Sequence, residues 1–382
     1  MRKEQFSARA PGRLVPTIYG AMAFVPDPAP RSLQLDNPTI GLLVLAEHRL
    51  GTLGGAAGRL LNPYVVIAPL LRQEAIASSR IEGTIATPEQ LALFEAGVDP
   101  TAQSSDTREV WNFVTATEHA VDRLGAGEPI ASRLLLDTHR LLMVDVRGNQ
   151  ERPGEFRSDQ NFIGTSRDIL AARFVPPPHL ELPKLISDLE HLVNDEGREL
   201  PRLVRAAIAH YQFETIHPFR DGNGRIGRLL VLLLMIRDGA IPSPLLPLSP
   251  AFERQRAEYA DLLLRVSTDN DWLPWIRFFL QGIVDSAEAA LHQVTALTDL
   301  REQWHGRFQA ARSSALLLKL IDRLFVHPAI TIGQTAELLQ VTPASASSNI
   351  AKLQAEGILT EVTGRTRDRI YVARDVLRFT AS

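Results

Sequence analysis

The chain has 382 residues, of which 45% are apolar and 22% are charged, enough for two or three domains at about 150 residues per domain. Its 41 basic and 44 acidic side chains give a net charge of -3, which excludes a chain that binds polyanions over its whole surface. Because there is no cysteine, disulfides, cysteine-ligated metals and a cysteine nucleophile are excluded as well.

The N-terminal region predicts neither a secretory signal nor a membrane anchor. Its first thirty residues contain no apolar run followed by a small-residue cleavage site. The longest apolar run of the chain, 229–236, is much shorter than the roughly 20 residues of a membrane-spanning helix. We therefore expect a cytoplasmic protein with no membrane contact. Prolines and glycines are frequent in the first forty residues, which favours an extended arm there.

Apolar residues recur at helical spacing along most of the chain, which predicts a mainly α fold. The first two expected helices are 40–60 and 65–77, and Thr87 followed by Pro88 is typical of the start of a third. A helical bundle is expected from the segments 109–124, 130–142, 183–194, 202–215, 225–237, 253–267 and 272–296. Between 148 and 178 the pattern breaks into short strand-like pieces, as in a β-hairpin.

The C-terminal part has a different pattern. Three expected helices precede two expected strands, an order that predicts a winged helix-turn-helix: helices 315–326, 331–339 and 343–356, then strands 357–362 and 369–372. From residue 301 onward there are 11 basic and 7 acidic residues, with Arg365, Arg367 and Arg369 clustered at the wing. This segment could bind DNA, or it could bind proteins or dimerise.

These patterns divide the chain into three expected domains. They are an N-terminal arm with helices, a helical core and the winged helix-turn-helix, at 1–108, 109–300 and 301–382.

The most informative segment is 217–228, which we call the core motif, between two expected helices: His-Pro-Phe-Arg-Asp-Gly-Asn-Gly-Arg-Ile-Gly-Arg. Gly222 and Gly224 allow successive backbone N–H groups to point into one concavity at a helix N-terminus, which is typical of a phosphate cradle. Asp221 beside the cradle suits a magnesium ion that bridges phosphate oxygens. Separately, each of these features also fits a tight turn between helices.

The charged ends of the core motif complete a site for phosphate chemistry. Arg225 and Arg228 are neighbours on the first turn of the following helix, where both could reach distal phosphates. His217, with a pKa near the operating pH, could accept a proton from an attacking hydroxyl. The alternative is that the arginines form ordinary surface ion pairs and the histidine is structural.

The core motif resembles the signature of the Fic family, HPFx[D/E]GNGRxxR, at every specified position. The resemblance implies a protein adenylyltransferase that moves AMP from ATP to a Ser, Thr or Tyr hydroxyl of a protein and releases pyrophosphate. It further implies that His217 is the general base, that Asp221 binds Mg²⁺, and that Asn223 holds the transferred phosphate with two backbone amides. Phe219 more plausibly anchors the loop in the core. The implied ATP site comprises Glu82, Gly222, Asn223, Gly224, Arg225, Gly227, Arg228 and Tyr259.

Two further features follow from the same resemblance. The segment 157–178 resembles the flap over the active site, where a target peptide could be held by strand addition; an ordinary hairpin fits equally. The flap residues expected to contact the target are Phe162, Ile163, Gly164 and Thr165. Tyr259 lies where family members stack an aromatic ring on the nucleotide base, although core packing would also explain it.

The segment 78–83, at the end of an expected helix, resembles the family's inhibitory motif, [S/T]xxxE[G/N]. Its specified positions are Ser78, Glu82 and Gly83, and the glycine suits a helix C-cap. The resemblance implies that Glu82 pairs with Arg228 and keeps the ATP γ-phosphate from binding productively. The alternative is a solvated glutamate at a helix end.

Three functions stay open at this point. The first is a protein adenylyltransferase autoinhibited by Glu82, acting on another protein or on itself. The second is another phosphate-group transfer, or the removal of AMP. The third is a nucleotide-sensing regulator that binds DNA through its C-terminal domain. The full GNGRxxR sequence favours AMP transfer, and the expected partners are ATP, a protein substrate and a second copy of the chain.

Overall fold

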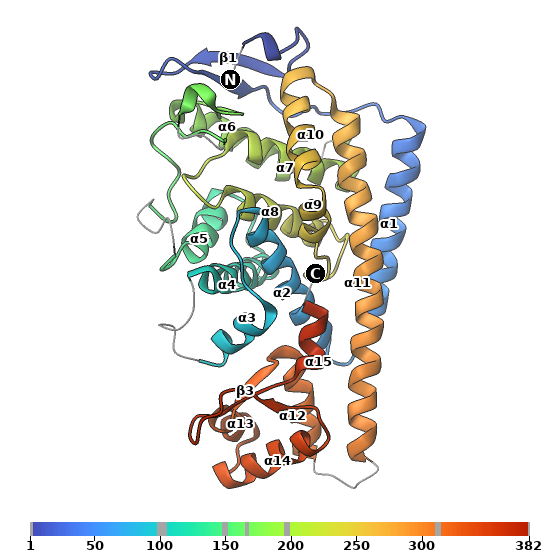
Figure 1. The fold of residues 1–382 in the computed structure, drawn as a ribbon. Coiled ribbons are helices and arrows are strands. Elements are labelled where there is room, and N and C mark those ends of the chain that lie inside the picture. The colour runs from blue at the N-terminus through green and yellow to red at the C-terminus, as the bar shows by residue number, and fades with distance from the viewer. Residues whose placement is uncertain are drawn as a thin grey trace.

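Helices form the body of the protein, and small β-sheets lie at its two ends (Figure 1). The computed structural model describes residues 3–97, 105–146, 152–164, 168–194, 199–309 and 315–380. The mainly helical fold predicted from the sequence is confirmed. None of the helices in these described ranges is long and apolar enough to cross a membrane.

The N-terminal region contains a β-hairpin, so the expectation of a merely extended arm is wrong. After a short 3₁₀ helix, η1 (Lys3–Gln5), strands β1 (Gly12–Pro16) and β2 (Met22–Pro26) pair antiparallel. Gly20 closes the turn with a φ of 78°, a conformation that glycine adopts without strain. The Phe24 N–H donates to the Val175 carbonyl at 3.0 Å, which attaches the hairpin to the flap.

The expected helices of the body are present, with boundaries that differ by a few residues. They are α1 (Asn37–Ala57), α2 (Tyr64–Ile81), α3 (Pro88–Glu95), α4 (Ser105–Gly125), α5 (Ser132–Leu142), α6 (Leu182–Asn194), α7 (Arg202–Ile216) and α8 (Asn223–Arg237). Thr87 caps α3 in a reciprocal capping box with Gln90, as the Thr-Pro pair predicted. Helices α2, α7 and α8 are buried along nearly their whole length, which places the two segments singled out from the sequence at the centre of the molecule.

Two helices differ more strongly from the boundaries expected from the sequence. The segment 253–267 is not one helix: α9 (Ser249–Arg254) and α10 (Arg256–Asp269) are separated at Gln255, whose backbone leaves the helical region. The last helix of the body, α11 (Trp272–Gln309), continues past its expected end at 296 and through the expected boundary at 300. Figure 1 shows α11 as a long helix that runs along α1 and reaches the C-terminal elements.

The flap (157–178) is narrow. Among its described residues the two sides meet in one antiparallel bridge, in which Ile163 and Phe174 exchange backbone hydrogen bonds of 2.8 and 3.1 Å. The 3₁₀ helix η3 (Ile169–Ala171) lies between the two bridge residues, and a second one, η4 (His179–Glu181), directly follows the flap. Thr165, expected to contact the target, lies outside the described residues.

The C-terminal elements follow the predicted order, with one strand more than expected. They are α12 (Ala315–Val326), β3 (Ala329–Thr331), α13 (Ile332–Leu339), α14 (Pro343–Ala355), β4 (Thr360–Glu361) and β5 (Ile370–Val372), then α15 (Arg374–Leu377) and η5 (Arg378–Thr380). The strands form an antiparallel sheet in the order β3-β5-β4. The strand β3 is too short for a sequence pattern of period 2 to reveal it. The assignment of these C-terminal elements as a winged helix-turn-helix stays a prediction.

These C-terminal elements pack directly against the body through α2 and α12. An ion pair lies at this contact: Arg72 of α2 donates two hydrogen bonds to Glu95 of α3, at 2.7 and 2.6 Å. His327, which follows α12, lies 3.4 Å from the same carboxylate. One buried carboxylate therefore links α2, α3 and the C-terminal part of the chain.

Candidate functional site

The core motif (217–228) forms a tight loop between α7 and α8. His217 ends α7 in a left-handed conformation with φ 50°, and Gly222 begins α8 with φ 76°. The Asn223 side chain closes the loop, because its amide accepts from the Phe219 N–H and donates to the Phe219 carbonyl, both at 2.8 Å. The Phe219 ring is fully buried and stacks on His139, with centroids 3.9 Å apart, so its expected anchoring role is confirmed.

Glycine suits both positions of the cradle. A Cβ atom added at Gly224 would lie 2.0 Å from Oε1 of Glu82, and one at Gly222 would lie 3.2 Å from Sδ of Met143. A side chain at Gly224 would meet Glu82, and one at Gly222 would have to adopt the left-handed backbone with φ 76° that glycine adopts without strain. The Gly222 N–H donates to Oδ1 of Asp221 at 2.6 Å, so the donors expected for an anion are the N–H groups of the next residues at the start of α8.

The inhibitory segment (78–83) holds Arg228 with three hydrogen bonds. Nε of Arg228 donates to the Ser78 hydroxyl, and Nη2 donates to the Ser78 carbonyl and to Oε1 of Glu82, each at 2.8 Å. Gly83 follows the helix in the left-handed region with φ 90°, as expected of a C-cap glycine. The ion pair inferred from the sequence is thus present, between an arginine buried to 98% of its side chain and a glutamate that is 36% exposed.

The charge balance of this pair favours the ionised glutamate. Burial alone would raise the pKa of Glu82, but the nearby Arg228 charge and its hydrogen bond outweigh burial and lower the pKa below its ordinary value. The carboxylate therefore stays charged at neutral pH. A phosphate can bind Arg228 only by displacing the Glu82 carboxylate that is already bound to it.

A cavity of about 600 Å³ opens beside the core motif, a volume suited to a nucleotide-sized ligand. Predicted site residues that line it come from four parts of the chain: Glu82, Ile163, Gly164, His217, Gly224, Arg228 and Tyr259. The predicted residues Ser78, Gly83, Phe162, Asp221, Gly222, Asn223, Arg225 and Gly227 lie outside this lining. Phe162 instead packs on the apolar cluster between the N-terminal hairpin and the flap.

His217 is held as a neutral imidazole. Its Nδ1 lies 3.2 Å from the Glu214 carbonyl and must donate the proton, which leaves Nε2 as the acceptor. Burial, helped by the positive charge of Arg157, lowers the pKa of His217 to about 4. The expectation of a pKa near the operating pH is therefore wrong for this arrangement, because burial and the nearby Arg157 charge disfavour the protonated ring. The imidazole is instead ready to accept a proton at any physiological pH.

Two family models match consecutive parts of the chain. The model described as the Fic/DOC family N-terminal region matches residues 40–122, and the model described as the Fic/DOC family matches residues 129–235. The chain belongs to the Fic/DOC family. The first match contains the inhibitory segment and the second contains the core motif.

Curated relatives carry the same family name. The chain is 32% identical over 188 residues to a Drosophila grimshawi protein named protein adenylyltransferase Fic, a match that covers 49% of this chain and 35% of the relative. It is 33% identical over 270 residues to the protein of that name from Drosophila willistoni, which covers 68% of this chain and 50% of the relative. The matched region thus spans between a third and a half of these relatives.

Solved Fic structures share the fold. A Fic family protein from Desulfovibrio desulfuricans G20 aligns with a TM-score of 0.58 at 22% identity, over 89% of this chain and 97% of that chain. Fic-1 from C. elegans aligns with a TM-score of 0.52 at 22% identity, over 69% of this chain and 75% of that chain.

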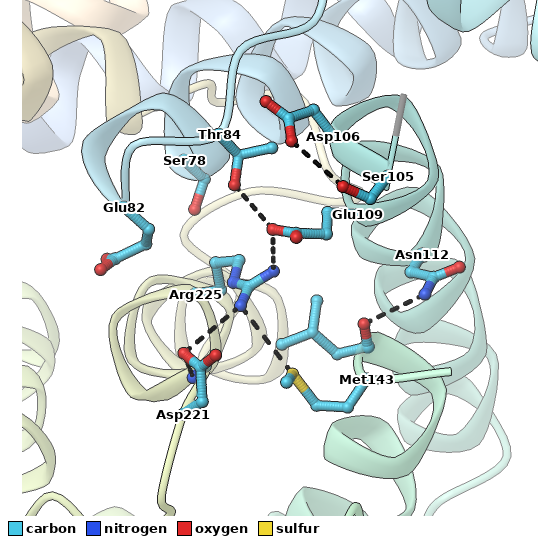
Figure 2. Close-up of polar contacts among 12 residues, drawn as sticks. Ser78, Glu82, Thr84, Ser105, Asp106, Glu109, Asn112, Met143, Asp221 and Arg225 are labelled. Carbon is cyan, nitrogen blue, oxygen red and sulfur yellow. Dashed lines mark hydrogen bonds and ion pairs between the residues drawn. The ribbon is translucent and has the colours of Figure 1, made fainter. Parts of the chain in front are cut away.

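The first arginine of the Fic motif lies away from the cavity. Arg225 was expected to reach distal phosphates, but its side chain is buried between α4, α5 and the motif loop (Figure 2). Nη1 lies 3.4 Å from Oε2 of Glu109, and Nη2 lies 3.7 Å from Oδ1 of Asp221. Glu109 is a contact that the sequence did not indicate, because it lies more than a hundred residues from the motif on another helix.

Arg157 fixes the Fic flap to the core motif, a role that sequence reasoning missed. Its guanidinium donates to four backbone carbonyls, those of His217 at 2.9 Å, Asp159 at 2.8 Å, Pro177 at 2.6 Å and Ile216 at 3.3 Å. Burial lowers the pKa of Arg157 to about 10. An isolated arginine at the start of an irregular segment carries no pattern that would have revealed this.

His139 of α5 supports the motif loop from behind and was also missed. Its Nδ1 accepts from the Gly154 N–H at 2.9 Å, so Nε2 carries the proton and donates to the Asp221 carbonyl at 3.1 Å. Burial lowers the pKa of His139 to about 4, which keeps this arrangement intact at neutral pH. A single histidine within an amphipathic helix gave no signal of this contact.

Tyr259, the expected partner of the nucleotide base, is only 7% exposed. Its ring stacks on Phe252 with centroids 4.9 Å apart, and its hydroxyl bonds to Nε2 of His210 at 2.6 Å. Since Nδ1 of His210 donates to the Gly227 carbonyl, the tyrosine hydroxyl is the donor in that bond. Tyr259 therefore combines a core position with an edge on the cavity wall, and its base-stacking role stays a prediction.

Glu214 is a buried acid on the wall of the Fic cavity that was not predicted. Burial raises the pKa of its carboxyl to about 8, against the opposing effect of Arg228. Its Oε1 has no hydrogen-bond partner among the described residues. The carboxyl is therefore protonated at neutral pH.

These buried groups set the pH dependence of folding. Burial lowers the pKa of His139 and His217 to about 4 and of His210 to about 3, so the unfolded chain binds protons that the folded chain does not below pH 6.5. Glu214 has the opposite effect between pH 4.5 and about 8, because its folded state keeps a proton that the unfolded state loses. We expect the free energy of unfolding to be highest near pH 6.5.

Urea unfolding at pH 5, 6.5 and 8 measures this pH dependence of the free energy of unfolding. The three histidines dominate on the acid side. Burial also raises the pKa of Glu74 and Glu118, so these carboxyls act in the same direction as Glu214. Glu214→Gln should therefore reduce the loss of stability between pH 6.5 and 8 and leave the loss below pH 6.5. A free energy of unfolding that rises from pH 6.5 to 8 in the unmodified chain would show that Glu214 is ionised in the folded protein.

Proposed function

We propose that the protein transfers AMP from ATP to a Ser, Thr or Tyr hydroxyl of a protein, another chain or itself, with release of pyrophosphate, and that Glu82 keeps it inactive. The observation that carries this proposal is the cavity in which a neutral His217, a glycine cradle and Arg228 lie together, with Glu82 bound to Arg228. The names of the curated relatives support the same reaction class.

The residues divide the work as follows. Nε2 of His217 accepts the proton of the target hydroxyl, whose oxygen then attacks the α-phosphorus of ATP while the bond to pyrophosphate breaks. The backbone N–H groups at the start of α8, that of Gly224 among them, stabilise the charge on the transferred phosphate. Arg228, once released from Glu82, binds the distal phosphates. The flap edge at Ile163 and Gly164 positions the target segment beside His217.

A magnesium ion fits the residues present. The Asp221 side chain is half exposed and stands next to the cradle, held by the Gly222 N–H at 2.6 Å. Within the described ranges no three His, Asp or Glu side chains form a cluster that could hold a metal. A single carboxylate is what Mg²⁺ uses when substrate phosphates and water complete its shell. When bound, the ion would neutralise charge that develops on the phosphates.

ATP labelled at the α- or the γ-phosphate tests the proposed reaction. With Glu82→Gly protein and Mg²⁺, we expect the α-label to appear on protein and the γ-label to leave as pyrophosphate, and EDTA should abolish the labelling. Transfer of the γ-label would show phosphorylation instead. Loss of label from a protein modified beforehand, without new labelling, would show AMP removal.

A second candidate function is a nucleotide-sensing regulator that binds DNA. Exposed basic and hydroxyl side chains on two neighbouring C-terminal elements favour it. They lie on the outer face of α14 and between β4 and β5: Ser347, Ser348, Lys352, Arg365, Arg367 and Arg369. Gel shifts with genomic fragments, with and without ATP, separate this candidate from the enzyme.

A further inference from the structure

A row of polar groups connects the expected metal ligand with the chain just after the inhibitory segment (Figure 2). Oδ1 of Asp221 lies 3.7 Å from Nη2 of Arg225. On the other side of the guanidinium, Nη1 lies 3.4 Å from Oε2 of Glu109, and the Thr84 hydroxyl donates to that same oxygen at 2.6 Å. Arg225 is thus shared between two carboxylates from different elements.

The two carboxylates differ in their surroundings. The side chains of Arg225 and Glu109 are 3% and 5% exposed, whereas that of Asp221 is 50% exposed. A buried guanidinium needs a compensating charge, since an unpaired buried ion is strongly destabilising. Among the described residues, its third side-chain contact is Sδ of Met143 at 3.8 Å, a neutral and weak acceptor that cannot supply that charge.

We propose that Glu109 is a positioning residue for metal binding: it holds and neutralises Arg225 so that the carboxylate of Asp221 is available to Mg²⁺. Without the Glu109 charge, Asp221 becomes the nearest carboxylate to Arg225, and their ion pair competes with the metal for the same oxygen atoms. The inference rests on the proposed function, because it assumes that Asp221 binds the metal.

Binding of Mn²⁺, a paramagnetic substitute for Mg²⁺, tests the inference without any catalytic step. The reference is the full chain with Glu82→Gly, saturated with a non-hydrolysable ATP analogue, and electron paramagnetic resonance gives the dissociation constant of Mn²⁺. Adding Glu109→Gln, which keeps the shape and removes the charge, should weaken Mn²⁺ binding by about tenfold or more, as typical when a group that orients a metal ligand is lost.

Thr84→Val is the matched control. It removes the hydroxyl that shares Oε2 of Glu109 but leaves the charge contact with Arg225, so Mn²⁺ affinity should stay within about twofold of the reference. An equal loss in both variants would overturn the inference, because the effect would then run through the inhibitory segment.

A double variant that removes both buried charges separates the loss of the Glu109 charge from a folding defect of Glu109→Gln. Glu109→Gln with Arg225→Gln removes both buried charges together, and nothing then competes with Mn²⁺ for Asp221. Its Mn²⁺ affinity should exceed that of Glu109→Gln alone and lie near the reference, a non-additivity expected of residues in one network. A tenfold loss in the double variant, or no loss in Glu109→Gln, would overturn the inference.

The readout also separates this inference from the proposed function. Normal Mn²⁺ binding without AMP transfer in the reference would count against the proposed function alone. Unchanged Mn²⁺ affinity in Glu109→Gln would count against the role of Glu109 alone. A reference that binds no Mn²⁺ would overturn the metal assignment on which both depend.

Discussion

His217→Ala should reduce AMP transfer by about a hundredfold to ten-thousandfold, the usual cost of losing a general base. Nucleotide affinity should be preserved, because the cradle consists of backbone N–H groups and the imidazole acts on the target hydroxyl. Initial rates with α-labelled ATP in a Glu82→Gly background, together with titration of a fluorescent ATP analogue, measure the two quantities separately.

The control is His48→Ala, which removes an exposed histidine from α1. It should change neither quantity. Because burial lowers the pKa of His217 to about 4, titration of this residue should not reduce the rate between pH 8 and 6. A His217→Ala protein that labels at nearly the reference rate would show that another group removes the proton.

Glu82→Gly should raise AMP transfer by roughly tenfold to a hundredfold, since a hydrogen bond to a charged group is worth about 1.5–3 kcal/mol. Removal of the carboxylate takes away the anion that competes with the distal phosphates of ATP for Arg228, while the two hydrogen bonds to Ser78 stay. Glu82→Gln should be intermediate, because it keeps some hydrogen bonding and loses the charge. Initial rates with α-labelled ATP again provide the measurement.

The partner of Glu82 supplies the decisive comparison. Arg228→Ala should lower AMP transfer both in the unmodified chain and in the Glu82→Gly variant. The double variant, Glu82→Gly with Arg228→Ala, should have the rate of Arg228→Ala alone, because Glu82 acts only through that arginine. Glu89→Gln, which alters a partly exposed carboxylate at the start of α3, is the matched control for Glu82→Gln. Equal rates for the unmodified chain and Glu82→Gly would mean that the ion pair does not inhibit.

Sequence reasoning succeeded where the signal is local. The core motif and the helix ahead of it follow from residue types at fixed spacing, and the structure contains both. The pairing of Glu82 with Arg228 was implied by the family resemblance of two local motifs, and the structure contains it as well. Helix boundaries were nearly correct because apolar periodicity and caps are local as well. The hairpin at Gly12–Pro26 was missed because proline and glycine at its ends suggested only irregular chain.

The missed site residues share a different cause. His139, Arg157 and Glu109 act on the core motif from other helices and from the flap, through contacts between residues 60 to 116 positions apart in the sequence. Each is a single polar residue in an ordinary pattern, so only the packing of α4, α5 and the flap around the loop reveals it. The burial that lowers the pKa of His217 is likewise a property of packing.

The position of α2 has a thermodynamic consequence. This helix ends in the inhibitory segment and also packs on α12, with Arg72 joined to Glu95 beside His327. A molecule that binds the C-terminal elements and shifts α12 would also shift α2. It would thereby change the free energy of the contact between Glu82 and Arg228. By linkage, ATP that displaces Glu82 must then change the affinity for that molecule by the same factor. Binding of ATP in the cavity and binding of a molecule to the C-terminal elements would therefore be coupled through one conformational equilibrium.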